Sequence, residues 1–133
     1  MIGAIIVSHE NLSRSILESL EKISGESKHI VPLSSRGVSP PKLEEEINTA
    51  VETMKGLEGV IIFADLYGGS CALVCGRIQR KNPDIPVITG FNLPLLIDFV
   101  FQRERPLAEI VARLIDRGRE GIRLLNCREE GGT

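Results

Sequence analysis

The sequence predicts an α/β fold, in which an open, doubly wound sheet of parallel strands carries helices on both faces. Short, continuous apolar runs at residues 2–7 and 59–64 are typical of strands that are buried on both sides. Stretches with apolar side chains at helical spacing alternate with the strands along the chain. This alternation is the pattern of βαβ units with right-handed crossovers.

Local signals place the elements of the first half of the chain. Gly25 follows a helical pattern as a stop signal, and Ser39 precedes another as an N-cap. The prolines at 40 and 41 are tolerated in a first helical turn. The expected elements are a strand at 2–7, a helix at 12–23, a strand at 29–33, a helix at 40–56 and a strand at 59–64.

The second half continues the alternation and ends in a tail. Pro94 and Pro106 open two helices, and Gly118 is the expected C′ residue of the second. We expect residues 1–125 to form a single domain and residues 126–133 to form a flexible tail. The expected elements are a turn at 65–70, a helix at 71–80, a strand at 85–89, helices at 93–101 and 106–117, and a short last strand at 121–125.

Composition narrows the class of protein. The net charge of −2 gives no electrostatic reason for binding nucleic acid or an anionic membrane. No apolar run approaches the roughly 18 residues of a membrane span, and the start of the chain lacks the basic region of a signal peptide. Three cysteines at irregular spacing fit a reducing compartment. We therefore expect a cytoplasmic protein without membrane insertion.

Polar side chains follow each predicted strand. In open parallel sheets, ligands bind beyond the carboxyl ends of the strands. If the strands at 2–7 and 59–64 are neighbours, as an order of 2-1-3-4 requires, their backbones lie about 4.8 Å apart. His9 and Asp65 then meet at one edge of the sheet. The other residues expected at this edge are Ser8, Glu10, Arg36, Gly68, Gly69, Ser70 and Asn92.

A histidine beside a carboxylate has a specific use. A carboxylate bonded to one ring nitrogen fixes the tautomer, leaves the other nitrogen's lone pair free and stabilises charge on the ring. The Gly68-Gly69-Ser70 loop opens a helix, where free N–H groups and the helix dipole attract anions. The combination predicts a phosphohistidine site. The chain has no glycine-rich nucleotide motif, and the chemistry requires no metal or cofactor.

Other interpretations of these residues stay open at this point. His9 alone is more often a surface residue, and Asp65 before two glycines is also a turn former. A hydrolase triad with Ser8 or Ser70 lacks the G-x-S-x-G elbow. Cys71 and Cys75 share a helix face and are better interpreted as buried small side chains than as metal ligands.

Three segments resemble the IIA domain of the mannose-type sugar phosphotransferase system. They are "MIGAIIVSHENLSRSILESLEKISG", "GVIIFADLYGGSCALVCGRI" and "PVITGFNLPLLIDFV", in the family's order and spacing. The resemblance implies the strand order 2-1-3-4 with a short antiparallel edge strand, and a homodimer that often exchanges this last strand. It also implies a phosphoryl carrier that takes its phosphoryl group from the phosphocarrier HPr and passes it to a IIB component.

The resemblance assigns roles to single residues. His9 matches the phosphorylated histidine, Asp65 its orienting carboxylate, and Ser70 the hydroxyl of the anion-binding loop. Asn92 matches a loop beside the site. The alternative is a regulatory or adaptor module that signals by phosphorylation or binding state without sugar transport.

The chain departs from the family pattern at two places. Glu10 stands where the family usually has glycine, and Cys71-Ala72-Leu73 replaces the usual Pro-Phe-Asn. A carboxylate about 6 Å from a phosphoryl charge is repelled by roughly 0.7 kcal/mol in water and roughly 2.8 kcal/mol at an effective dielectric of about 20. We expect Glu10 to lower the phosphoryl-transfer potential or change the choice of partner unless it points outward.

Overall fold

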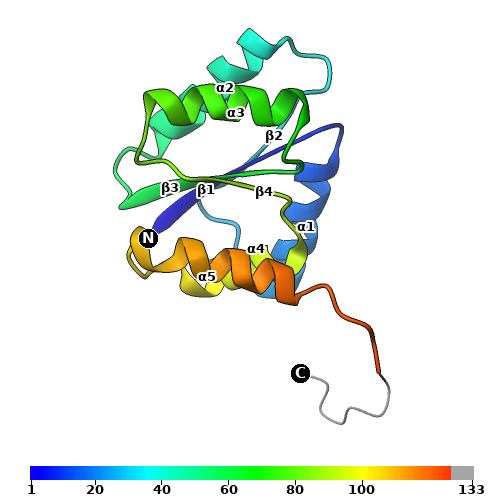
Figure 1. Ribbon diagram of the computed structural model, residues 1–133. Helices are drawn as coiled ribbons and strands as arrows, with labels where there is room; N and C mark the ends of the chain where they lie inside the picture. Colours follow the sequence, from blue (N-terminus) through cyan, green and yellow to red (C-terminus); the bar gives the residue numbers. More distant parts are fainter. Residues whose placement is uncertain (127–133) are drawn as a thin grey trace.

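The computed structural model describes residues 1–126, and residues 127–133 of the predicted tail lie outside the described residues. The described chain forms three layers (Figure 1). A parallel four-stranded sheet lies between one layer of α2 and α3 and another of α1, α4 and α5. The elements are β1 (Ile2–Ser8), α1 (Leu12–Ser24), β2 (Ile30–Ser34), α2 (Pro40–Thr53), β3 (Gly59–Ala64), α3 (Gly69–Lys81), β4 (Val87–Thr89), α4 (Leu93–Gln102) and α5 (Leu107–Glu120).

The sheet has the order β2-β1-β3-β4, which confirms the predicted order. The register brings the carboxyl ends of the strands together. Ser8 of β1 pairs with Ser34 of β2, while Val7 pairs with Ala64 of β3, and Ala64 pairs with Thr89 of β4. The loops that leave these strands therefore start from one edge of the sheet.

Both faces of the central strands are buried, which explains their continuous apolar sequences. Ile2, Ala4 and Ile6 of β1 pack with residues of α1, α4 and α5. Ile5 and Val7 point to the other face and pack with residues of α2 and α3. Successive side chains of a strand point to opposite faces, so a strand covered on both sides needs apolar residues throughout.

Local signals set several helix ends as predicted. The Ser39 hydroxyl accepts a hydrogen bond from the Lys42 N–H at 3.3 Å and caps α2. Gly25 ends α1 in the left-handed conformation, with φ of 74°. Pro40 occupies the first turn of α2, where its missing N–H costs no helical hydrogen bond.

Two predicted boundaries are wrong for reasons of packing and pairing. Gly118 is buried inside α5 and is not its C′ residue. A Cβ at Gly118 would lie 3.0 Å from Leu95 Cδ1, so this glycine permits close packing of α4 and α5. β4 begins at Val87 rather than at residue 85. Pro86 accepts a hydrogen bond from Ile62 but has no N–H to donate.

The predicted antiparallel edge strand at 121–125 is not formed in the described chain. Residues 122–126 have no regular secondary structure and lead away from the sheet (Figure 1). Ile122, Leu124 and Leu125 are 81%, 93% and 87% exposed. A strand needs a partner edge for its N–H and C=O groups, and residues 121–125 pair with no strand of the described chain.

No helix in the described part of the chain combines the length and apolar character that crossing a bilayer requires.

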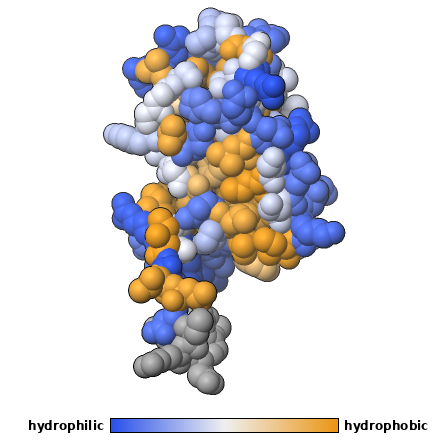
Figure 2. Space-filling model, turned by 90° about the vertical axis from the view of Figure 1, so that its right-hand side faces the viewer, coloured by the Kyte–Doolittle hydropathy of each residue, from blue (hydrophilic) through white to orange (hydrophobic). Residues whose placement is uncertain are grey.

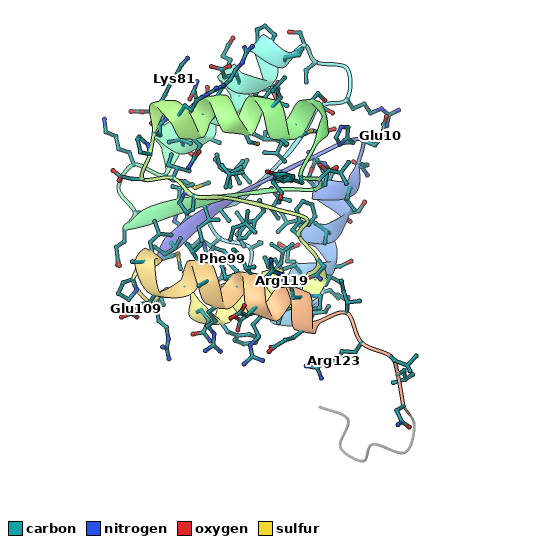
Figure 3. The ribbon with its side chains drawn as sticks, viewed as in Figure 1. Glu10, Lys81, Phe99, Glu109, Arg119 and Arg123 are labelled. Carbon is teal, nitrogen blue, oxygen red and sulfur yellow. The ribbon has the colours of Figure 1, made fainter. Side chains whose placement is uncertain are left out.

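Phe99 anchors the helical layer of α4 and α5 to the sheet (Figure 3). Its ring is fully buried and meets the Phe63 ring edge-on, with 5.4 Å between centroids. We expect Phe99→Ala to lower the free energy of unfolding by about 3–5 kcal/mol. Phe101→Ala on the same helix is the matched control, because Phe101 is 69% exposed. Urea-induced unfolding measures both, and equal losses would contradict this account of the core.

Candidate functional site

His9 and Asp65 meet directly at the carboxyl edge of the sheet, as the sequence predicts. His9 follows β1 and Asp65 follows β3, 56 residues later. The Nδ1 atom of His9 lies 2.8 Å from Asp65 Oδ2, and the His9 main-chain N–H donates to the same oxygen at 2.9 Å. The Asp65 N–H donates to the carbonyl of Val7 at 3.2 Å. Adjacent parallel strands therefore hold both residues in place.

The hydrogen bonds of this pair define the state of the imidazole. Asp65 is an acceptor when ionised, so Nδ1 carries a proton and Nε2 presents a lone pair. Burial opposes the ionisation of Asp65, but hydrogen bonds from the His9 main chain and ring outweigh it and hold its pKa below the usual 3.8. The His9 side chain is 39% exposed, against 9% for Asp65. The reactive ring is thus open to solvent while its carboxylate is not.

The amino end of α3 lies against the free edge of the imidazole. A Cβ built on Gly69 would lie 3.4 Å from His9 Cε1 and 3.5 Å from His9 Nε2. Gly69 also has φ of 87°, a value that residues with a side chain rarely adopt. No side chain among the described residues caps the first turn of α3, so its N–H groups remain available to an anion. Ser70 lies exposed in this turn.

Ser8 supports the loop rather than lining the site. The side chain is fully buried, and its hydroxyl accepts a hydrogen bond from the Ser13 N–H at 2.7 Å. The Ser13 hydroxyl in turn donates to the carbonyl of Leu33 in β2. This burial corrects the expectation that Ser8 lines the site, and it removes Ser8 as the nucleophile of a hydrolase triad.

Glu10 and Arg36, both expected near the site, pair with each other. Glu10 Oε2 lies 3.4 Å from Arg36 Nε, and both side chains are exposed. Glu10 lies at the sheet edge where β1 passes into α1 (Figure 3). Its φ of 48° is left-handed, and the Ser34 hydroxyl donates to its carbonyl. Arg36 therefore offsets the negative charge that the sequence places directly after His9.

Asn92 is an N-cap whose amide is occupied within the fold. Its Oδ1 accepts a hydrogen bond from the Leu95 N–H at 3.0 Å, and its Nδ2 donates to the Gly118 carbonyl at 2.9 Å. An asparagine before Leu-Pro is itself a helix-start signal. The residue thus ties α4 to α5 next to the sheet edge.

Cys71 is buried in the core, as the sequence predicts, and its sulfur also lies close to the site. Cys71 Sγ, a ring nitrogen of His9 and a carboxylate oxygen of Asp65 all lie within 4.8 Å of one another. The thiol is buried, and this burial raises its pKa. Cys75, one turn later, is also buried, and burial raises its pKa to about 12.

The family model and the curated relatives are consistent with each other. The model of the EIIA-man family, described as "PTS system fructose IIA component", matches residues 3–115. The "PTS system mannose-specific EIIAB component" of Escherichia coli K12 is 27% identical over 134 residues, which is 96% of this chain and 40% of that protein. The chain thus spans less than half the length of that relative.

Solved structures share the fold. The phosphotransferase system component EIIA of Streptococcus agalactiae has a TM-score of 0.84 at 29% identity, covering 93% of this chain and 97% of its own. The mannose/sorbose-specific IIA subunit of Enterococcus faecalis has a TM-score of 0.82 at 21% identity, covering 96% of both chains. The second likeness concerns the fold alone.

Substitutions of Glu10 test how much a side chain in the left-handed conformation lowers the free energy of unfolding. Glu10→Gly and Glu10→Ala both remove the pair with Arg36, but only glycine accepts a positive φ freely. We expect Glu10→Gly to be more stable than Glu10→Ala by roughly 1 kcal/mol in urea-induced unfolding. Glu10→Ala itself changes the free energy of unfolding by less than about 1 kcal/mol, because the lost ion pair is exposed. Equal stabilities of the two variants would contradict strain at this position.

The lowered pKa of Asp65 predicts a loss of stability in acid. The contribution of this carboxylate is fully present above the pKa of unfolded aspartate, and it is lost as the pH falls through the lower folded value. Free energies of unfolding from pH 7 to pH 2 should therefore decrease less steeply for Asp65→Asn than for the wild type. Asp84→Asn, at an exposed position, controls for the removal of a carboxylate. Parallel profiles of Asp65→Asn and wild type would refute the assigned hydrogen bonds.

Proposed function

The chain belongs to the EIIA-man family of IIA components, which are phosphoryl carriers of the sugar phosphotransferase system, and we propose that His9 is its phosphorylated residue. The proposed donor is the phosphohistidine of HPr, and the proposed acceptor is a IIB component. The observation that carries this assignment is the contact between His9 Nδ1 and Asp65 Oδ2, which leaves Nε2 free beside the amino end of α3.

The proposed reaction is a direct displacement at phosphorus. The lone pair of His9 Nε2 forms the new nitrogen–phosphorus bond while the bond from phosphorus to the donor imidazole breaks, and the electron pair returns to the donor nitrogen. Positive charge develops on the His9 ring. Asp65 stabilises this charge through the Nδ1–H hydrogen bond, which also fixes the ring orientation. Transfer to the acceptor is the same step in reverse, with a new nucleophile.

The first turn of α3 supplies the groups that hold the phosphoryl oxygens. Its N–H groups and helix dipole favour an anion, and the Ser70 hydroxyl adds a donor. Gly69 allows the backbone to approach the ring, whereas a Cβ on Gly68 would meet no atom within 4 Å. These groups stabilise charge on the transferred group without a metal ion, because the donor is itself a phosphohistidine.

Exposed apolar side chains around the site support the proposal that it binds a protein partner. Figure 2 shows apolar surface on the face that carries the strand ends. Leu66 and Tyr67, which directly follow Asp65, are 55% and 86% exposed, and Leu12 near His9 is 47% exposed. Exposed apolar patches of this kind are typical of sites for protein contact.

A homodimer and a cytoplasmic location are further parts of the proposal. The family resemblance implies a dimer that exchanges its last strand. The exposed side chains of Ile122, Leu124 and Leu125 and the position of β4 at the sheet edge support such an exchange. The cytoplasmic location stays a prediction from the sequence.

Phosphate labelling tests the assignment. With enzyme I, HPr and labelled phosphoenolpyruvate, we expect label on the wild type and on His29→Gln, but none on His9→Gln. His29 is the matched control because it precedes β2, at the opposite end of the strands from His9. Asp65→Asn should be labelled about 100-fold more slowly, because the ring loses its orienting and charge-stabilising partner.

The same experiment decides between the two functions considered. Label that persists in His9→Gln would reject His9 as the carrier residue. A wild type that takes no label from phospho-HPr would favour the adaptor function, which the comparisons do not support.

A further inference from the structure

We propose that His9, Asp65 and Cys71 form a binding site for Zn²⁺. The three residues each contribute one ligand atom to a group that spans no more than 4.8 Å. They come from three separate segments, the loops after β1 and β3 and the first turn of α3. Imidazole nitrogen, carboxylate oxygen and thiolate sulfur are the three ligand types that Zn²⁺ takes in proteins.

An unsatisfied oxygen of Asp65 supports this assignment independently. Asp65 Oδ2 receives both hydrogen bonds from His9, while Oδ1 is buried and has no hydrogen-bond partner within residues 1–126. The side chain as a whole is only 9% exposed. A buried carboxylate oxygen without a donor costs free energy, so most such atoms have a partner. A cation held by the same three residues supplies one.

The site suits a bound ion with one open position. Three protein ligands leave a fourth tetrahedral position of Zn²⁺ for water. The His9 ring is 39% exposed, so this position can face solvent although Cys71 is buried. Binding requires the thiolate, and the thiol proton is released to solvent. The positive end of the α3 dipole disfavours a cation, but it also stabilises the Cys71 thiolate that binds the cation. Its two effects on metal binding therefore oppose each other.

Zn²⁺ at this site would compete with phosphorylation, a consequence that rests on the proposed function. An ion on Nε2 occupies the lone pair that attacks phosphorus. An ion on Nδ1 displaces the proton from that nitrogen, and the neutral imidazole then carries its proton on Nε2, which leaves no lone pair to attack phosphorus. In either case His9 cannot act as the nucleophile, so binding the metal and carrying the phosphoryl group exclude each other.

Cobalt binding tests the site without any phosphoryl transfer. Co²⁺ replaces Zn²⁺ and shows a thiolate-to-metal absorption band when a cysteine binds it. All variants are made in a Cys127→Ser parent, which removes the thiol that lies outside the described residues. We expect the band in this background and in Cys75→Ala, and its loss on addition of Zn²⁺. Cys71→Ala, His9→Gln and Asp65→Asn should each weaken binding by more than about 10-fold.

Cys75→Ala is the matched control. Cys75 is buried on the same helix but does not belong to the group of three. Circular dichroism and thermal unfolding establish that each variant is folded before titration. Absence of the band in the parent, its persistence in Cys71→Ala, or its loss in Cys75→Ala would each overturn the proposal.

Transfer from purified phospho-HPr, with no enzyme I present, tests the consequence. The ratio of the rates with and without Zn²⁺ should fall well below one for the parent and for Cys75→Ala, and should stay near one for Cys71→Ala. A parent that binds Co²⁺ but takes no label retains the metal site and contradicts the carrier function. A parent that takes label but binds no Co²⁺ retains the carrier function and contradicts the metal site.

Discussion

The hydrogen bonds from His9 to Asp65 depend on the register of β1 and β3. Val7 and Ala64 are paired across these strands, so the next residue of each chain leaves the sheet beside the other. A shift by one residue would turn every side chain of β1 to the opposite face and separate the pair. Because both faces of β1 pack against apolar helices, the core enforces the register on which the site depends.

The same construction explains why the site combines a fixed carboxylate with an open ring. The Asp65 N–H donates to the Val7 carbonyl, and the main-chain and ring N–H groups of His9 donate to the Asp65 carboxylate. The Asp65 side chain is also almost fully buried. His9 projects from the edge and remains partly exposed beside the uncapped start of α3. Such a site needs little rearrangement to bind an anion, because its charges and N–H groups are already oriented.

Two departures from the family pattern have different physical consequences. Glu10 strains the left-handed turn but pairs with Arg36, so its charge is directed along the surface. Cys71 lies within the group of reactive side chains and adds a soft ligand to a histidine and a carboxylate. The first change affects the stability of the loop, while the second gives the site a chemistry that an imidazole and a carboxylate alone lack.

Periodicity and helix signals in the sequence determined the fold class, the parallel strands, the cap at Ser39 and the strand ends after which His9 and Asp65 lie, because these depend on neighbouring residues. The contact of His9 with Asp65 also required β1 and β3 to be adjacent in the sheet. Long-range contacts decided the rest. Gly118 lies inside a helix against which Leu95 packs, and residues 121–125 form no strand because no strand of the described chain pairs with them. The positions of Ser8, Asn92 and Cys71 also needed the tertiary structure, because burial and hydrogen-bond partners are set by elements distant in the chain.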